Sequence, residues 1–271
     1  AAVLVALALA VALDLPIESI VTVGFIERSL QAATPIALAA IGGLYAEKSG
    51  VFNIGLEGFM ILGAANAAAF VWLIGGESPT QGDLWLAILA AVLVSLVYSL
   101  LFAVLLVRYR ADQIVAGLAV WFIGLGFGPF SAVLIWGNRN SPGLASVNDV
   151  TVPVLANVPV LGPILFDTSP LVLATAVAAV VAWVFLYRTR YGYWIQAAGE
   201  NPEALDTAGV SVRRVRYASV LFSGAMAGLA GAVLFAHAGS FTGTGDTMVN
   251  GRGWIGIVAY LFGNYNPIGA A

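Results

Sequence analysis

The side chain best placed for chemistry is Glu57, an acid near the start of the apolar segment 54–74. An ionised carboxylate is costly inside a membrane, so acids within membrane segments are often functional. A structural role is the alternative. Asn53 can cap the helix that carries Glu57, and an acid in the first turn of a helix interacts favourably with the positive helix end. We expect Glu57 either to stabilise this helix or to line a path for a substrate, and the two roles are compatible.

Two other polar side chains stand inside apolar segments. Asn66 lies further along the segment of Glu57, and a buried Asn bonds a neighbouring helix more often than it binds a ligand. His237 is the single histidine, and we expect a neutral, hydrogen-bonded residue rather than a proton carrier. One imidazole cannot form a metal site by itself, so the sequence predicts no metal centre.

The motifs of common catalytic sites are missing from the sequence. The nearest approach to the phosphate-binding loop G-x-x-x-x-G-K-[ST] runs from Gly43 to Lys48-Ser49, and Glu47 occupies the position that requires glycine. Neither H-E-x-x-H nor G-x-S-x-G occurs. We therefore predict that the chain is not an enzyme, holds no cofactor, and depends on another chain for any use of ATP.

The composition indicates that lipid is the main solvent of this chain. Of its 271 residues, 61% are hydrophobic and 9% are charged, and the mean hydropathy is +0.95. Soluble domains carry about 25% charged residues. The net charge of −3 provides no basic surface for nucleic acid, and the lack of Cys excludes a disulfide framework.

A helix that crosses the bilayer needs roughly 20 apolar residues, and the elements that carry these side chains have about this length. We predict an all-α, polytopic membrane bundle in which Pro and Gly interrupt helices and small residues allow close packing. The chain is expected to be truncated at both ends, because the first and last apolar segments are short and no initiator Met is present. The predicted spans are residues 1–13, 29–46, 54–74, 84–107, 114–136, 170–187, 217–239 and 254–271.

The distribution of Lys and Arg predicts the orientation, because cytoplasmic loops carry an excess of basic residues. We place residues 47–53, 108–113 and 188–216 in the cytoplasm, where eight basic residues gather. The segments that then face outward carry only three basic residues; they are residues 14–28, 75–83, 137–169 and 240–253. The Pro-rich loop 137–169 serves either as a connection or as a docking surface for an external partner. The eight are Lys48, Arg108, Arg110, Arg188, Arg190, Arg213, Arg214 and Arg216, and the three are Arg28, Arg139 and Arg252.

A weak internal symmetry relates two parts of the chain. Segments 29–46 and 217–239 each lead through a polar stretch, 47–53 or 240–253, into a further apolar segment. Their predicted orientations are opposite, as in the inverted repeats of transporters, where helix breaks lie near the substrate path. The symmetry predicts about two further helices beyond residue 271.

The cytoplasmic stretch contains a short helix with clear end signals. Asn201 is a predicted N-cap, Pro202 stands at the first helical position, Glu203 lies in the first turn and Gly209 ends the helix. Two turns are too few to be stable alone. This helix is therefore expected to pack on its own bundle or on a soluble partner, through an apolar face of Ala204, Leu205 and Ala208.

Three blocks of the sequence resemble one transporter family. They are Thr34-Pro35 with the run from Gly42 to Gly58, then Gly199 to Ala204 with Ala208-Gly209, and Gly251 to Ile255 followed by Phe262-Gly263 and Asn266-Pro267. Together they resemble the permeases of ABC importers of the nucleoside and simple-sugar group, within the branched-chain amino acid and ribose permease superfamily.

The resemblance implies a membrane subunit that pairs with a second permease, identical or homologous, around a central path in the plasma membrane of a prokaryote. A cytoplasmic ATPase would carry ATP and Mg²⁺, and an extracytoplasmic binding protein would deliver the substrate. The implied pathway residues are Asn53, Glu57, Asn66, Asn250 and Arg252. The implied ATPase-docking residues are Glu200, Asn201, Pro202, Glu203, Ala204, Leu205 and Asp206.

We therefore expect an ATP-driven importer of a nucleoside or simple sugar that works by alternating access. Another small solute, such as a branched-chain amino acid, is an alternative substrate. A secondary transporter driven by ions through Glu57 or His237 is a second alternative, although charged residues are scarce in the membrane segments. A channel-type structural subunit is a third, and a membrane enzyme lacks a recognisable nucleophile and base.

Overall fold

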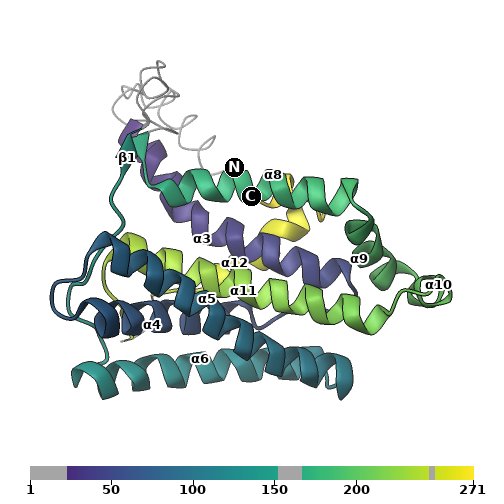
Figure 1. Cartoon of the computed structure of the whole chain (residues 1–271), viewed down its shortest axis with the longest axis horizontal. Coiled ribbons are helices and arrows are strands. Elements are labelled where there is room, and N and C mark those ends of the chain that lie inside the picture. The colour runs from purple at the N-terminus through teal and green to yellow at the C-terminus, as the bar shows by residue number, and fades with distance from the viewer. Residues whose placement is uncertain (1–22, 152–166, 244–247) are drawn as a thin grey trace, which may run out of the picture.

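The computed structural model describes residues 23–151, 167–243 and 248–271. This part of the chain is a bundle of helices (Figure 1), and the predicted all-α, multi-pass fold is confirmed. A minor two-stranded pairing joins β1 (Val150–Thr151) to β2 (Asp167–Thr168) in antiparallel register. The helices are α3 (Val23–Lys48), α4 (Leu56–Gly75), α5 (Gln81–Ala103), the π-helical turn η1 (Val104–Arg108), α6 (Gln113–Trp136), α8 (Pro170–Arg188), α9 (Arg190–Glu200), α10 (Pro202–Thr207), α11 (Val212–Ala238), α12 (Arg252–Phe262) and α13 (Pro267–Ala270).

Six of these helices are long and apolar enough to cross a membrane, namely α3, α4, α5 with η1, α6, α8 and α11. The predicted span 1–13 lies outside the described residues. The predicted span 254–271 is not continuous, because α12 has only 11 residues and ends at Phe262. Asn264 and Tyr265 then adopt left-handed backbone conformations, with φ of 54° at both. A right-handed α-helix cannot continue through residues in this conformation.

Side-chain caps fix where several spanning helices begin. Thr80 and Asp83 form a reciprocal capping box at the start of α5. The Asp112 carboxylate accepts hydrogen bonds from the amides of Ile114 and Val115 at the start of α6. These bonds satisfy amides that have no partner within the helix, so the loops before α5 and α6 end at definite residues.

The two segments of the weak internal symmetry, which form α3 with α4 and α11 with α12, pack against each other. Helices α3 and α11 are antiparallel neighbours, because Gly42 meets Ser223 while Ser49 meets Arg216. Helix α4 packs along α11, and α12 packs along α3 (Figure 1), whereas α4 makes few contacts with α3. The most extensive contact of α4 is therefore with α11, and that of α12 is with α3, so the helix after each break packs on the long helix of the other segment.

Small residues allow α4 and α11 to approach closely. A Cβ atom at Gly63 would overlap the carbonyl group of Gly228, and a Cβ at Gly231 would overlap the carbonyl oxygen of Met60. Close helix contacts of this kind hold membrane bundles together, since lipid supplies no hydrophobic force between helices. The result is a tight core on which the breaks after α3 and α11 are positioned.

The outer faces of α5, α6 and α8 are apolar and exposed. Leu101 on α5, Leu134 on α6 and Val181 on α8 are 61%, 74% and 59% exposed. Such a surface suits contact with acyl chains. Within the bilayer core, polar groups without a hydrogen-bond partner cost free energy, whereas apolar side chains that face lipid do not. The multi-pass membrane location predicted from composition is confirmed.

The connecting segments gather at the two ends of the bundle. Residues 49–52, 108–113 and 189–216 lie together at one end, which we call the arginine end. Residues 76–80 and 137–151 lie at the opposite end together with residues 239–243, which we call the loop end. The segments that the basic residues predict to share one side of the membrane therefore share one end of the fold.

Candidate functional site

The first turns of α4 and α12 meet inside the bundle at Glu57. The Gly251 amide donates a hydrogen bond to Glu57 Oε1 at 2.8 Å, and the Gly253 amide donates to Oε2 at 2.7 Å. Glu57 is only 3% exposed. No side chain of its own segment caps α12, so the distant carboxylate supplies the acceptor and the negative charge that a helix N-terminus favours.

Glycine is required at this junction for steric reasons. A Cβ atom on Gly253 would lie 2.5 Å from both the Cα and the amide nitrogen of Glu57. Gly251 has a φ of +81°, a conformation that side chains rarely adopt. The Gly-Arg-Gly sequence at residues 251–253 therefore permits the backbone of α12 to reach the first turn of α4.

Asn53 holds the break between α3 and α4 against α11. Its Oδ1 accepts from the Gly55 amide at 3.0 Å, and its Nδ2 donates to Ser223 Oγ at 2.9 Å. The prediction that Asn53 caps α4 is wrong. The N-cap residue is Gly55, and among the described residues no side chain accepts a hydrogen bond from the free amides of the first turn of α4 as a cap. Asn53 instead forms a local turn over two residues, and it is completely buried.

Ser223 places this break well inside the bundle. It lies eleven residues after Val212 in the 27 residues of α11. Both α4 and α12 consequently begin within the bundle rather than at its surface. Discontinuous helices of this kind occur at transporter binding sites, where helix ends point at the substrate or a coupling ion.

The other predicted pathway residues occupy different surroundings. Asn66 is half-buried and donates to the Leu62 carbonyl of its own helix at 2.7 Å, which differs from the expected bond to a neighbouring helix. Asn250 is exposed, with φ of 46°. Arg252 is half-buried, and its Nη1 donates to the carbonyl groups of Met248 and Val249, which closes the turn before α12.

An aromatic pair adjoins the junction, and the sequence did not single it out as a pair. Trp254 follows Gly253 and meets Trp121 of α6 edge to face, with ring centroids 5.8 Å apart. Phe122 lies 5.1 Å from Trp121 and is 62% exposed. Aromatic rings that remain partly exposed beside polar groups offer a stacking surface. The proximity of two glycines to Trp254 is the signal that could have identified it.

His237 lies away from this junction. Its Nε2 is 3.0 Å from Ser169 Oγ, which also caps α8. It is therefore a hydrogen-bonded residue of the bundle, as predicted. Within residues 23–151, 167–243 and 248–271, no three His, Cys, Asp or Glu side chains gather in a group that could hold a metal ion.

At the arginine end, Arg216 joins three segments. Its Nε donates to the Ser49 carbonyl at 3.1 Å, and its Nη2 donates to the Ala198 carbonyl at 3.0 Å. Gly199 of α9 also packs directly on the Lys48 carbonyl. Arg216 of α11 therefore ties α9 to the chain that leaves α3 and leads to the Asn53 break.

The short helix after α9 has the predicted ends. Asn201 Oδ1 accepts from the Ala204 amide at 3.1 Å, Pro202 is the first residue of α10, and Gly209 is left-handed with φ of +81°. Of the expected apolar face, Leu205 is buried within this chain at 5% exposure. This residue therefore packs on its own bundle, one of the two partners expected for the face, and is not available to another chain. Other predicted docking residues are exposed, namely Glu200, Asn201, Glu203, Ala204 and Asp206, and Pro202 is half-buried.

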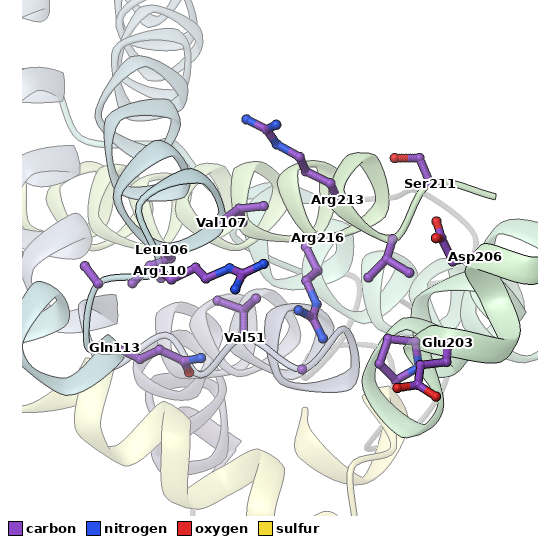
Figure 2. A pocket seen from close by; sticks show the side chains of 14 residues that line it. Val51, Leu106, Val107, Arg110, Gln113, Glu203, Asp206, Ser211, Arg213 and Arg216 are labelled. Carbon is purple, nitrogen blue, oxygen red and sulfur yellow. The ribbon is translucent and has the colours of Figure 1, made fainter.

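A cleft of about 570 Å³ separates α10 from the ends of η1, α6 and α11. Figure 2 shows Glu203 and Asp206 on its α10 side, with Arg110 and Arg216 across from them. Val51 and Gln113 also line it, and Gln113 Oε1 accepts from the Phe52 amide at 2.7 Å. The cleft thus lies between α10 and the loop that leads to Asn53.

At the loop end, the described part of loop 137–169 covers the end of α11. The amides of Ser141, Leu144 and Val147 donate to the carbonyl groups of Phe241, Gly239 and Ala236. Gln81 binds the same segment through the Ser146 carbonyl and the Asn148 amide. The segment 141–148 is therefore fixed to the bundle along its length.

Comparison with known proteins identifies the family. The chain is 37% identical over 90% of its length to the guanosine ABC transporter permease protein NupQ of Bacillus subtilis, covering 76% of that protein. It is 36% identical over 88% of its length to the nucleoside ABC transporter permease protein NupC of Lactococcus lactis, covering 74% of it.

A third relative is the putative glucose ABC transporter permease protein TsgC13 of Haloferax volcanii, at 31% identity over 90% of this chain and 71% of that protein. No solved structure matches the sequence. A family model described as "Branched-chain amino acid transport system / permease component" matches residues 25–271. The chain therefore belongs to this family and is an ABC transporter permease.

Proposed function

We propose that the chain moves a nucleoside through the plasma membrane of a prokaryote as the membrane subunit of an ATP-driven importer. Two relatives with 37% and 36% identity are named as guanosine and nucleoside permeases. A simple sugar is the second candidate, because a relative with 31% identity is named as a putative glucose permease.

One observation carries the proposal of a substrate path: two helix N-termini meet at Glu57 beside a partly exposed aromatic pair. Trp121 and Trp254 can stack against a nucleobase, whose flat face suits an aromatic surface. We assign the path to this pair together with Asn53, Glu57, Asn66, Asn250 and Arg252. A second permease, identical or homologous, closes the other side of the path.

The arginine end is proposed to face the cytoplasm, as the excess of basic residues favours. A separate ATPase subunit, which binds ATP and Mg²⁺, docks on the exposed residues of α10 and on Glu200. The loop end then receives substrate from an extracytoplasmic binding protein. Leu205 holds α10 to its own bundle, so the ATPase contacts the polar side of this helix.

Transport follows from a change in relative position of rigid parts. Movement of the ATPase displaces α9 and α10, and Arg216 transmits this displacement to the loop after α3. The loop is continuous with Asn53 and Glu57, so the contact between α4 and α12 changes. The substrate moves because outward-open and inward-open states bind it with different affinity.

The test is reconstitution of the full-length permease with its ATPase, its second permease and its binding protein in proteoliposomes. We expect ATP hydrolysis to be stimulated by guanosine or adenosine more than by ribose, glucose or leucine. Stimulation by leucine alone would overturn the substrate assignment. Uptake that follows an ion gradient and continues without ATPase would overturn the mechanism and favour a secondary transporter.

Docking is tested separately by co-purification. Glu203→Arg reverses a charge on the exposed side of α10 and should release the ATPase from the permease. Glu77→Arg is the matched control, because Glu77 is an exposed acid beyond the end of α4. Retention of the ATPase by both variants would contradict the docking assignment.

A further inference from the structure

An apolar cavity opens on the side of the bundle between α3, α8, α9 and α11. Its volume is about 370 Å³, within the range of about 300–1,000 Å³ found for small-molecule sites. The lining residues are Ile41, Tyr45, Ala178, Val181, Ala182, Phe185, Ile195, Ala218, Ser219, Phe222 and Met226. The junction at Glu57 contributes none of them, so this cavity is separate from the proposed path.

The cavity opens laterally, toward the surroundings of the bundle. Val181 and Phe185 on α8 are 59% and 38% exposed, and Ala218 on α11 is also exposed. Ile195 of α9 is buried and lines the cavity nearest the arginine end. In a membrane, acyl chains surround α8, so the molecules with direct access to this opening are lipids.

One buried polar group in this lining has no partner among the residues that the structure describes. Ser219 is 2% exposed, and its hydroxyl makes no hydrogen bond to the described part of the chain. The Tyr45 hydroxyl, by contrast, donates to the Ala182 carbonyl at 2.7 Å. A buried hydroxyl without a partner costs free energy, so the Ser219 hydroxyl is available to donate to an acceptor atom that enters the cavity.

A cationic aromatic cluster adjoins the opening. Tyr191 stacks on Phe185 with centroids 6.3 Å apart and planes at 6°. The Arg190 guanidinium lies 5.0 Å from the Tyr191 ring and 5.9 Å from the Trp194 ring. Arg190 is exposed, which leaves its charge available to a phosphate group, and Tyr and Trp favour the membrane interface.

The depth of Ser219 agrees with this arrangement. Arg213 and Arg214 in the first turn of α11 are exposed, as expected for residues at a lipid headgroup region. Ser219 lies five residues beyond Arg214, which is about 7.5 Å along a helix. An ester carbonyl at the boundary between headgroups and acyl chains is an acceptor at this level.

We propose that this cavity binds one phospholipid with an anionic headgroup. An acyl chain fills the space between α3, α8 and α11, the Ser219 hydroxyl donates to an ester carbonyl, and Arg190 faces the phosphate. The occupied site links α8 and α9 to α11. No atom of the nucleoside path takes part, so the proposal is independent of the transported substrate.

The test measures lipid retained by the full-length permease complex after purification in mild detergent, by native mass spectrometry. The probes are phosphatidylglycerol and phosphatidylcholine vesicles, with inorganic phosphate as a separate competitor. We expect one tightly held phospholipid per chain, a preference for phosphatidylglycerol and no displacement by inorganic phosphate. Displacement by phosphate alone would show an anion site without an acyl chain and would overturn the proposal.

Three variants assign the site. Ala218→Phe fills the opening and should lose the retained lipid, whereas Ser219→Ala should retain it at several-fold lower occupancy. Arg190→Gln should abolish the preference for phosphatidylglycerol. The controls are Ser131→Ala, where the wild-type hydroxyl donates to the Gly128 carbonyl of its own helix, and Arg108→Gln at an exposed arginine on η1.

The outcomes distinguish the lipid from other occupants. If another protein segment or the second permease fills the cavity, Ala218→Phe will reduce recovery of the complex and leave the lipid content unchanged, which overturns the proposal. Ser219→Ala removes the hydroxyl and adds no atom to the cavity, so it tests the site even if Ala218→Phe does not fold. Equal lipid occupancy in Ser219→Ala and Ser131→Ala would exclude the assigned hydrogen bond.

Discussion

Glu57 and Gly253, which are 196 residues apart in the chain, are joined by a 2.7 Å hydrogen bond from the Gly253 amide to Glu57 Oε2. The bond connects the first turn of α4 to the first turn of α12. Because α4 packs on α11 and α12 packs on α3, this contact links the two inverted segments at their breaks.

Replacement of Glu57 tests the strength of this link. Glu57→Gln removes the charge and keeps one acceptor for two amide donors, so we expect a loss of roughly 1.5–3 kcal/mol, as for hydrogen bonds to charged groups. The measurement is thermal unfolding of the purified complex, with Glu77→Gln as a control at an exposed acid. Equal unfolding temperatures for the two variants would contradict the capping role of Glu57.

Gly253→Ala tests the steric requirement of the same junction. The new methyl group would meet the backbone of Glu57 at 2.5 Å, and we expect a loss of about 1–3 kcal/mol from overpacking. Gly126→Ala is the control, because no atom lies within 4 Å of a Cβ at that position. Unfolding midpoints report the difference, and a neutral effect at Gly253 would mean that α12 moves away without cost.

Arg216 is predicted to couple ATP hydrolysis to transport. The Arg216 guanidinium donates to the Ser49 and Ala198 carbonyl groups from two different nitrogens. Lysine has a single ammonium nitrogen, so Arg216→Lys should lose one of these bonds, at a cost of about 1.5 kcal/mol. We expect roughly tenfold less uptake per ATP hydrolysed, with ATPase still bound. Arg214→Lys, at an exposed residue of the same helix turn, should keep the wild-type ratio. Loss of ATPase binding in Arg216→Lys would indicate a docking role instead.

The aromatic pair is predicted to select nucleosides over sugars. Trp254→Ala removes one stacking surface, worth about 1–3 kcal/mol per base, so the KM for guanosine should rise about 5- to 150-fold. Any response to ribose should change much less, because ribose lacks the base. Trp85→Ala on α5, where Trp85 is 42% exposed, is the control. Equal shifts for guanosine and ribose would place the pair outside the base site.

The N-cap of α10 is predicted to control the local stability of the docking helix. Asn201→Ala removes the acceptor for the Ala204 amide, at a cost of about 1 kcal/mol. Hydrogen exchange of the α10 amides should then accelerate about fivefold, while exchange in α4 stays unchanged. Asn201→Ser keeps an acceptor and should restore protection. Equal exchange in the Ala and Ser variants would show that packing of Leu205 alone holds the helix.

Local sequence was sufficient to predict most of the spanning helices and both ends of α10, but not the N-cap of α4 or the end of α12. The apolar lengths predicted the spans α4, α5, α6 and α8, because backbone groups in lipid must be satisfied within a helix. Asn201, Pro202 and Gly209 defined α10 by interactions within a few residues. The excess of arginine predicted which loops lie together. Each spanning helix carries the chain to the other side of the membrane, so every second loop lies on the same side.

Only the tertiary structure decided the partners of the polar residues. Asn53 bonds Ser223 of α11 as well as the nearby Gly55 amide, and Glu57 caps α12 rather than serving α4 alone. Leu205 faces its own bundle, and Trp254 meets Trp121 of a distant helix. These contacts join residues that are up to about two hundred positions apart. Which residues become partners depends on how closely glycine allows two helices to approach. The hydrophobic pattern along a single segment carries no information about that distance.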